Sequence, residues 1–187
     1  VGAGIGGLTA ARALALRGAQ VTVLEQAPAI TEVGAGLQIS PNGLSVLRAL
    51  GLEAPLRATG APRSRALVLR DARGRRLARF PYAGLARPDD YLFVHRADLI
   101  DVLAKGARDV GVTLRLGATV DRVDPGVPSV HLTTGDVLQA DLILGADGLH
   151  SQVRAAILPP EDPFFTGQVA WRAVIPGDDG PAEAQLF

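Results

Sequence analysis

The sequence predicts an α/β fold whose first unit is a tight turn, a helix and a strand. Three observations lead to this prediction. Glycines at the start of the chain have the spacing Gly-x-Gly-x-x-Gly, at Gly2, Gly4 and Gly7. A helical apolar face follows them, and an acidic residue, Glu25, closes the next strand candidate. Together these features are typical of a Rossmann-like unit that binds a dinucleotide.

Each glycine of this turn has a physical role. Gly2 permits the tight turn, Gly4 lets the backbone approach a pyrophosphate, and Gly7 lets the helix pack closely on its strand. The phosphates would lie at the N-terminal end of the helix, where the dipole is positive and free N–H groups point outward.

The helix and the strand after the turn follow from apolar spacing. Ala11 and Leu14 continue the face of Gly7 at i+4 and i+7, so this face meets a sheet. Gly18 ends the helix, and residues 20–24 form the strand candidate.

Glu25 lies where an acidic residue is expected, about 20 residues past the glycines. A carboxylate at this position accepts hydrogen bonds from the two ribose hydroxyls. It would repel a 2′-phosphate on that ribose, because both groups are negative. The ligand of this stretch is therefore FAD or NAD, and the stretch alone does not choose between them.

Composition excludes several classes of function. The 187 residues are 48% apolar and 20% charged with zero net charge, which fits a soluble globular protein and gives no electrostatic case for nucleic acid or membrane. The absence of cysteine excludes disulfides, thiolate metal sites and thiol nucleophiles. Neither a membrane span nor a signal peptide is evident. We therefore expect a cytoplasmic protein that binds neither nucleic acid nor membrane, and we assign no metal site.

The two ends of the sequence suggest a longer parent. Val1 stands directly at the glycine turn, although a strand should precede that turn in a βαβ unit. Residues 185–187 resemble the middle of a strand. We expect the sequence to be an internal fragment.

A glycine-containing loop and a second helix follow the first unit. Gly34 and Gly36 allow the backbone to pass close to another group, although a flexible loop explains them equally well. Ser40 is an N-cap candidate, Pro41 suits the first helical position, and Gly51 ends the helix.

Residues 65–80 have the pattern of a β-hairpin with its turn at residues 71–74. Seven arginines lie between Arg63 and Arg79, which raises a nucleic-acid surface as an alternative. No aromatic residue is interleaved with them, so a solvated hairpin face is favoured.

A third helix is expected from Ala97 to Val110, ended by Gly111. Arg96 stands at its start, where a cation opposes the helix dipole. This position suggests an anionic partner such as a phosphate, and the alternative is a surface arginine paired with a carboxylate.

The second half of the chain is expected to contain short strands. Four of them should form a small antiparallel meander, at residues 112–116, 118–123, 129–132 and 136–140.

A buried apolar strand is expected at residues 141–144, followed by Asp147 in a glycine-flanked turn and by a helix that begins near Ser151. Ligands of open α/β sheets bind at the carboxyl ends of strands, where Asp147 would project. An equally simple role for Asp147 is to cap the helix that follows. The tail at residues 164–175 is expected to form one or two strands, and its aromatic residues fit either a pocket wall or an ordinary core.

Three stretches taken together resemble one family, the FAD-dependent aromatic-ring hydroxylases related to salicylate and para-hydroxybenzoate hydroxylases. These stretches are the glycine turn with Glu25, the loop at residues 32–36 with Ser40-Pro41-Asn42, and the Gly145-Ala146-Asp147-Gly148 run with Ser151 and Arg154. Arg96 in His95-Arg96-Ala97-Asp98-Leu99 and the tail at residues 166–172 resemble the salicylate and 6-hydroxynicotinate branch. The resemblance covers nearly the whole chain.

The resemblance implies a residue-by-residue FAD site. Gly2, Gly4 and Gly7 would hold the pyrophosphate, and Glu25 the adenosine ribose. The remaining candidates are Ala35 and Gly36 near the ribityl and phosphate region, Arg96 at the ribityl–pyrophosphate part, the backbone near Val120 at the adenine, and Asp147 for both FAD and transient NAD(P)H. A later Gly-Asp-Ala-Ala-His-type motif that completes the ribityl site in the family does not occur in this sequence.

The implied activity is that of a monooxygenase that uses FAD and consumes NAD(P)H. Reduced flavin would capture O₂ as a hydroperoxide and transfer one oxygen atom to a small phenolic or hydroxy-acid ring. No catalytic residue is assigned, and the oligomeric state is not predicted. The alternatives are another flavoprotein of the same fold, such as an isoprenoid reductase or an epoxidase, and a non-catalytic nucleotide-binding remnant.

The resemblance also implies a para-hydroxybenzoate hydroxylase-like fold of two domains. The FAD-binding domain would comprise residues 1–62 and 92–160. A partial, mixed-sheet substrate domain would comprise residues 63–91 and 161–187.

Overall fold

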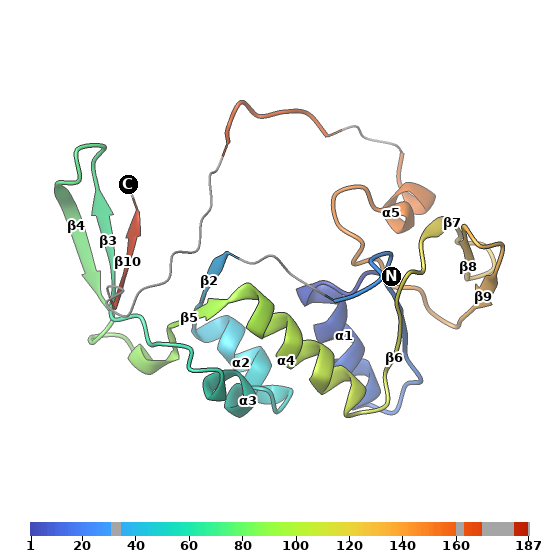
Figure 1. The fold of residues 1–187 in the computed structure, drawn as a ribbon, viewed down its shortest axis with the longest axis horizontal. Helices are drawn as coiled ribbons and strands as arrows, with labels where there is room; N and C mark the ends of the chain where they lie inside the picture. Colours follow the sequence, from blue (N-terminus) through green and yellow to red (C-terminus); the bar gives the residue numbers. More distant parts are fainter. Residues whose placement is uncertain (31–34, 160–162, 170–181, 187) are drawn as a thin grey trace. The chain divides into compact units, whose positions relative to one another are not determined.

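The computed structural model describes residues 1–30, 35–159, 163–169 and 182–186. They form α-helices and short β-strands, which confirms the predicted α/β class (Figure 1). Internal contacts divide the chain into two compact units, unit 1 with residues 1–32 and 100–170 and unit 2 with residues 33–99 and 171–187. These units differ from the two predicted domains, whose boundaries stay a prediction.

Unit 1 begins with the predicted turn, helix and strand. Helix α1 (Ile5–Ala15) starts directly after Gly4 and contacts strand β1 (Thr22–Leu24). Gly18, with φ of 89°, lies in the connection between them, as the sequence predicts. Strand β1 pairs in parallel with β6 (Thr113–Arg115).

The parallel pairing of β6 corrects the predicted meander, which wrongly included residues 112–116. Parallel strands need a long crossover, and here the connection includes helix α4 (Arg96–Arg108). The pairing continues past both strands, because the N–H of Glu25 donates to Arg115 O at 2.9 Å and that of Ala118 donates to Glu25 O at 2.8 Å. Residues 112–116 therefore extend the sheet of the glycine turn.

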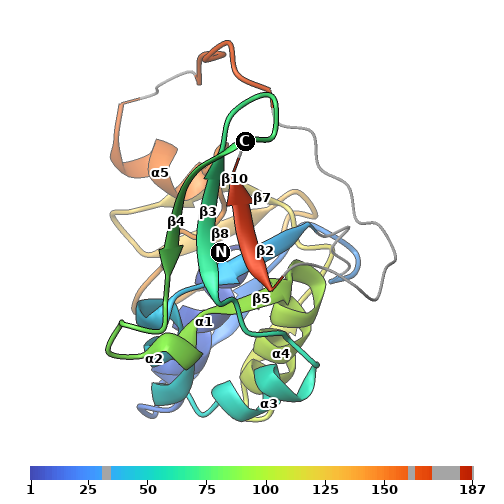
Figure 2. The same cartoon turned by 90° about the vertical axis from the view of Figure 1, so that its left-hand side faces the viewer.

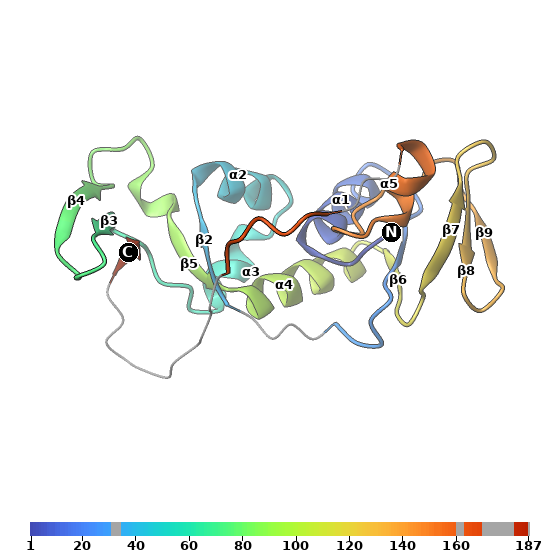
Figure 3. The same cartoon turned by 90° about the horizontal axis from the view of Figure 1, so that it is seen from above.

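The remaining three strands do form an antiparallel meander in the order β7-β8-β9 (Figure 3). They are β7 (Val120–Asp124), β8 (Ser129–Leu132) and β9 (Val137–Gln139). One side of the meander packs on the end of β1, in a cluster of the buried residues Leu24, Ala118, Val130 and Leu132.

Residues 141–144 do not form the predicted buried strand. They have no regular secondary structure, and the side chains of Leu142 and Leu144 are 64% and 43% exposed. A strand buried on both faces needs neighbours along its length, whereas the described backbone hydrogen bonds of residues 142–146 all go to Val1. The helix predicted after Asp147 is present as α5 (Gln152–Ile157), which contacts β7.

Unit 2 is built on the antiparallel pair of β2 (Gly36–Ile39) and β5 (Leu92–His95). The predicted helix that follows β2 is α2 (Pro41–Ala49), whose leucines Leu44 and Leu47 are buried. A further short helix, α3 (Glu53–Ala58), was not predicted because it spans only six residues and contains a proline. A single 3₁₀ turn, η1 (Pro88–Asp90), precedes β5.

The predicted hairpin is also present in unit 2. Strands β3 (Ala66–Arg70) and β4 (Arg76–Pro81) pair antiparallel, and Gly74 in their turn has φ of 79°. Strand β10 (Glu183–Leu186) lies parallel to β3 on its other edge, so the sheet has the order β10-β3-β4 (Figure 2).

The tail differs from its prediction where it is described. Residues 163–169 contain no strand, and the side chains of Phe164 and Phe165 are 83% and 77% exposed. These two rings therefore line no pocket in this structure. The rest of the predicted tail, residues 170–175, lies outside the described residues. Within the described ranges, no helix is long and apolar enough to cross a membrane.

Candidate functional site

The glycine turn of unit 1 is shaped by close contacts of the protein with itself. Gly2 has φ of 96°, and a Cβ added to it would lie 2.3 Å from the carbonyl oxygen of Ala146. A Cβ on Gly7 would lie 1.9 Å from the carbonyl oxygen of Gly2. Both positions therefore require glycine so that α1, the turn and the loop at residue 146 can pack together.

Gly4 differs from the other two glycines because the space beside it is open. A Cβ on Gly4 would meet no heavy atom within 4 Å. Gly4 is also the N-cap of α1 with no side-chain cap, and the first turn of the helix carries no acidic residue. The N-terminal end of α1 thus presents backbone N–H groups beside a cradle that a side chain would fill, which suits a pyrophosphate.

Glu25 lies at the end of β1 and is bonded to the turn. Its Oε2 accepts a hydrogen bond from the backbone N–H of Ala3 at 2.8 Å, and its Oε1 accepts one from that of Ala27 at 2.9 Å. Each carboxylate oxygen keeps a further lone pair for a ribose hydroxyl. The carboxylate is therefore fixed in place beside the turn before any ligand arrives.

Asp147 accepts hydrogen bonds at the N-terminal end of helix α5, whose N-cap residue is Ser151. Its Oδ1 accepts from Ser151 Oγ at 2.5 Å, and its Oδ2 accepts from the N–H groups of Gln152 at 2.8 Å and Val153 at 3.2 Å. Burial acts to raise the pKa of Asp147, but these hydrogen bonds, first that of Ser151, outweigh it and lower the pKa below its usual value. The structure therefore shows Asp147 bonded to the start of the following helix, and a direct role of Asp147 toward FAD or NAD(P)H stays a prediction.

The cap of Asp147 holds the loop that contacts the glycine turn. The N–H of Ala146 donates to Val1 O at 2.8 Å, and the carbonyl of Ala146 faces Gly2. Sequence reasoning noticed Asp147 but not Ala146, because a contact made by a backbone carbonyl leaves no side-chain signature. Val120 joins the same region from β7, since it packs on the cluster that contains Leu24.

Three predicted residues of unit 2 lie together at one end of the β2–β5 pair. The N–H of Arg96 donates to Ala35 O at 3.2 Å, and Gly36 is paired with His95, the neighbour of Arg96. A Cβ on Gly36 would meet no heavy atom within 4 Å. The described part of the chain therefore gathers the nine predicted cofactor residues into two groups, one in each unit.

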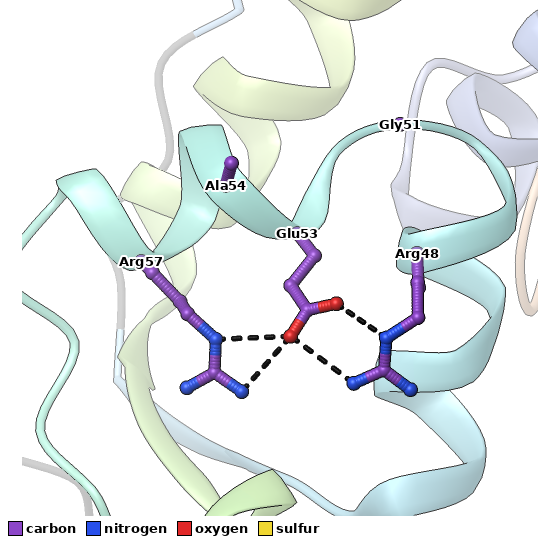
Figure 4. A pocket seen from close by; sticks show the side chains of 5 residues that line it. All are labelled: Arg48, Gly51, Glu53, Ala54 and Arg57. Atoms are coloured by element: carbon purple, nitrogen blue, oxygen red, sulfur yellow. Dashed lines mark hydrogen bonds and ion pairs between the residues drawn. The ribbon is translucent and has the colours of Figure 1, made fainter.

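The charged hollow in unit 2 contains none of these nine residues (Figure 4). Its lining includes Glu53 between Arg48 and Arg57, and Glu53 bonds both arginines, with Arg48 Nε at 2.5 Å and Arg57 Nε at 3.0 Å. The buried Asp90 accepts from Arg48 Nη2 at 3.1 Å and from Arg57 Nη2 at 3.4 Å. This network ties α2, α3 and η1 together. Because its charges are already paired, we assign it a structural role.

No group of three or more His, Asp or Glu side chains suited to a metal ion occurs among the described residues.

Comparison with known families supports a flavin site. The family described as FAD binding domain matches residues 1–170. The chain is 39% identical to the 3-amino-4-hydroxybenzoate 2-monooxygenase of Streptomyces cremeus, over 97% of this chain and 47% of that protein. It is 36% identical to the 6-hydroxynicotinate 3-monooxygenase of Bordetella bronchiseptica, over 94% of this chain and 47% of that protein. The chain thus spans about half the length of the curated relatives it matches.

A solved structure has a fold similar to that of this chain. The crystal structure of 2-methyl-3-hydroxypyridine-5-carboxylic acid oxygenase superposes with a TM-score of 0.75 and 34% identity. The match covers 83% of this chain and 40% of that one.

Proposed function

The chain belongs to the family of FAD-binding domains, and from that membership we propose that the full-length protein is an FAD-dependent monooxygenase that hydroxylates a small aromatic ring. The relatives support this proposal, since two of them are named for oxygenation of hydroxylated ring acids. NAD(P)H as reductant and O₂ as co-substrate are part of the proposal, and so are the cytoplasmic location and the aromatic partner.

The observation that carries the proposal is the arrangement at the glycine turn. Gly4 leaves an open cradle at the N-terminal end of α1, and Glu25 is fixed beside it by the N–H of Ala3. The adenosine half of FAD requires donors for its pyrophosphate beside an acceptor for its ribose, so this arrangement supports the proposal.

We assign the other parts of the cofactor to the remaining predicted residues. Arg96, held against Ala35, would contact the ribityl–pyrophosphate part, and the backbone near Val120 would meet the adenine. Gly36 would allow close approach, because no heavy atom lies near the position of its absent Cβ. The Asp147 loop would contribute by supporting the turn at Gly2. The chemistry that bound FAD supplies is reduction by NAD(P)H followed by reaction with O₂.

Expression of the full-length protein tests the proposal. We expect a yellow protein whose NAD(P)H oxidation increases with a hydroxylated ring acid and yields a product with one added oxygen atom. Suitable probes are 3-amino-4-hydroxybenzoate, 3-hydroxybenzoate and 6-hydroxynicotinate. A colourless protein that cannot be reconstituted with FAD would contradict the proposal. Flavin reduction without a hydroxylated product from any ring acid would favour a reductase or epoxidase of the same fold.

A further inference from the structure

The β2–β5 pair of unit 2 has one buried face and one open face. Residues two apart on a strand share a face, and so do paired residues on neighbouring strands. Leu92 and Val94 on β5 are buried, together with Ile39 opposite Leu92. The other face carries Gly36 and Gln38, which are exposed, and their partners His95 and Phe93, which are half-buried. We name these four residues the open face.

The side chain of Gln38 is held in place on this open face. Its Nε2 donates to the hydroxyl of Tyr82 at 3.0 Å. Tyr82 is only 8% exposed, and its ring stacks on that of Tyr91 with centroids 3.9 Å apart. The N–H of Tyr82 donates to Arg65 O at 2.9 Å, so both its backbone and its ring are fixed. A surface glutamine would ordinarily keep its rotamer freedom, whereas this amide is anchored by a buried tyrosine.

Strand geometry sets the position of Gln38 relative to Gly36, the residue predicted to lie near the ribityl and phosphate region of FAD. Gly36 and Gln38 lie two residues apart, which separates them by roughly 6–7 Å along the strand. That separation is close to the width of one aromatic ring. A group that lies against Gly36 therefore leaves room for a neighbouring ring against Gln38 and Phe93.

The chemistry of the open face suits a hydroxylated ring acid. Phe93 supplies an apolar surface for a ring, and none of the four residues is acidic. With Nε2 directed to Tyr82, the Oε1 of Gln38 is the atom that can accept a hydrogen bond from a ligand.

We propose that Gln38 binds the aromatic substrate by accepting a hydrogen bond from a ring hydroxyl or amino group, and that Tyr82 positions its amide. This inference rests on the proposed function, because the substrate class comes from there. The inference places substrate recognition on strand β2, two residues from Gly36, which is predicted to lie close to the cofactor.

The test uses the full-length protein, the variant Gln38→Leu and two ligands that differ by one hydroxyl. Dissociation constants of 3-hydroxybenzoate and benzoate are measured from the change in the absorption spectrum of the bound flavin. We expect Gln38→Leu to raise the dissociation constant of 3-hydroxybenzoate roughly 3- to 10-fold, which is the effect of losing one neutral hydrogen bond. The affinity for benzoate should change less than about twofold, because benzoate lacks the donor.

Two tyrosine variants form a matched pair for the positioning role. Tyr82→Phe removes the hydroxyl that holds Gln38. It should raise the dissociation constant of 3-hydroxybenzoate about twofold or more and change that of benzoate little. Tyr91→Phe removes a hydroxyl from the stacked neighbour that does not bond Gln38, and it should leave both affinities unchanged. A merely structural role for the tyrosine pair would affect both ligands equally.

The outcomes separate this inference from the proposed function. A wild-type protein that binds no flavin, or whose flavin spectrum responds to no ring acid, would overturn both. A wild-type protein that responds, with Gln38→Leu losing equal affinity for both ligands or losing FAD itself, would overturn only the assignment of Gln38 to the substrate.

Discussion

Gly2, Gly4 and Gly7 are the same residue type with two different physical requirements. Gly2 and Gly7 are in contact with backbone atoms of the protein, at Ala146 and at Gly2 itself. Gly4 faces open space. A glycine motif in a sequence therefore combines positions needed for folding with a position needed for the ligand, and the two kinds can be separated by substitution.

Gly4→Ala should lower FAD affinity, whereas Gly2→Ala should lower stability. The backbone of Gly4 has φ of −72°, which alanine adopts without strain, so Gly4→Ala should leave thermal stability unchanged but lower FAD affinity on the order of tenfold. Gly2→Ala should destabilise the fold by about 2 kcal/mol or more, because of its positive φ and the contact with Ala146 O. Thermal unfolding of the apoprotein and flavin fluorescence titration measure the two effects. Loss of apoprotein stability in Gly4→Ala would contradict the separation.

Glu25→Lys should weaken FAD binding by roughly tenfold or more, since it removes the ribose acceptor and the anchor on Ala3. Glu25→Gln serves as the control, because its amide oxygen can still accept from Ala3 and one ribose hydroxyl. We expect its affinity for FAD to lie between those of the wild type and the lysine variant. An unchanged flavin affinity in Glu25→Lys would show that Glu25 does not bind the ribose.

The lowered pKa of Asp147 makes stability depend on pH in a defined direction. A carboxyl group whose pKa is lower in the folded state stabilises the fold above its unfolded pKa of about 3.9, and this contribution is lost as the pH falls through the folded pKa. Asp147→Ala removes the acceptor for the N–H groups of Gln152 and Val153 and should cost about 1 kcal/mol at pH 7. Denaturant unfolding should show that the difference from wild type shrinks below pH 4. A difference that is constant with pH would contradict the assigned cause.

At the scale of elements, the order of helices and strands along the chain was largely predictable from the sequence. The pairing of strands that lie far apart in the sequence was not. Helix α1, helix α2 and the β3–β4 hairpin follow from apolar spacing and from glycines at positive φ, such as Gly18 and Gly74. The pairing of β6 with β1 was missed because local spacing does not reveal a crossover. The prediction of a buried strand at residues 141–144 was wrong for a related reason, since apolar residues form a buried strand only where neighbours cover them.

The network around Glu53 joins three elements that local sequence does not connect. The hydrogen bond from Arg48 is the main cause that lowers the pKa of Glu53, so its stabilisation is present above the unfolded pKa and is lost as the pH falls. Glu53→Gln should lower Tm by about 1–3 °C at pH 7, with no difference at low pH. Asp89→Asn is the control, because its ion pair with Arg63 is exposed on both sides and should contribute nothing measurable. An equal decrease of Tm in both variants would show that the Glu53 network contributes no more to stability than the exposed ion pair.

At the scale of the whole molecule, the residues that sequence motifs predict for the cofactor fall into two groups, and their roles stay a prediction. The glycine turn, Glu25 and Asp147 fall together in unit 1, and Ala35, Gly36 and Arg96 fall together in unit 2. The supports of the site were not predictable, because Ala3 and Ala146 act through backbone atoms that every residue type carries. The anchoring of Gln38 by Tyr82 was likewise hidden, since it links residues from different strands through a single side-chain hydrogen bond.

The contact between the glycine turn and the Ala146 loop has a consequence for how the protein acquires its cofactor. It joins backbone positions as far apart as 143 residues, through Val1 and Leu144. At about 5–20 residues per second, a ribosome needs roughly 7–30 s to make that length of chain. Until then the turn lacks the loop that supports it, so the nascent chain carries the motif without the finished site. We therefore expect FAD to bind only after the chain has been made through the Ala146 loop.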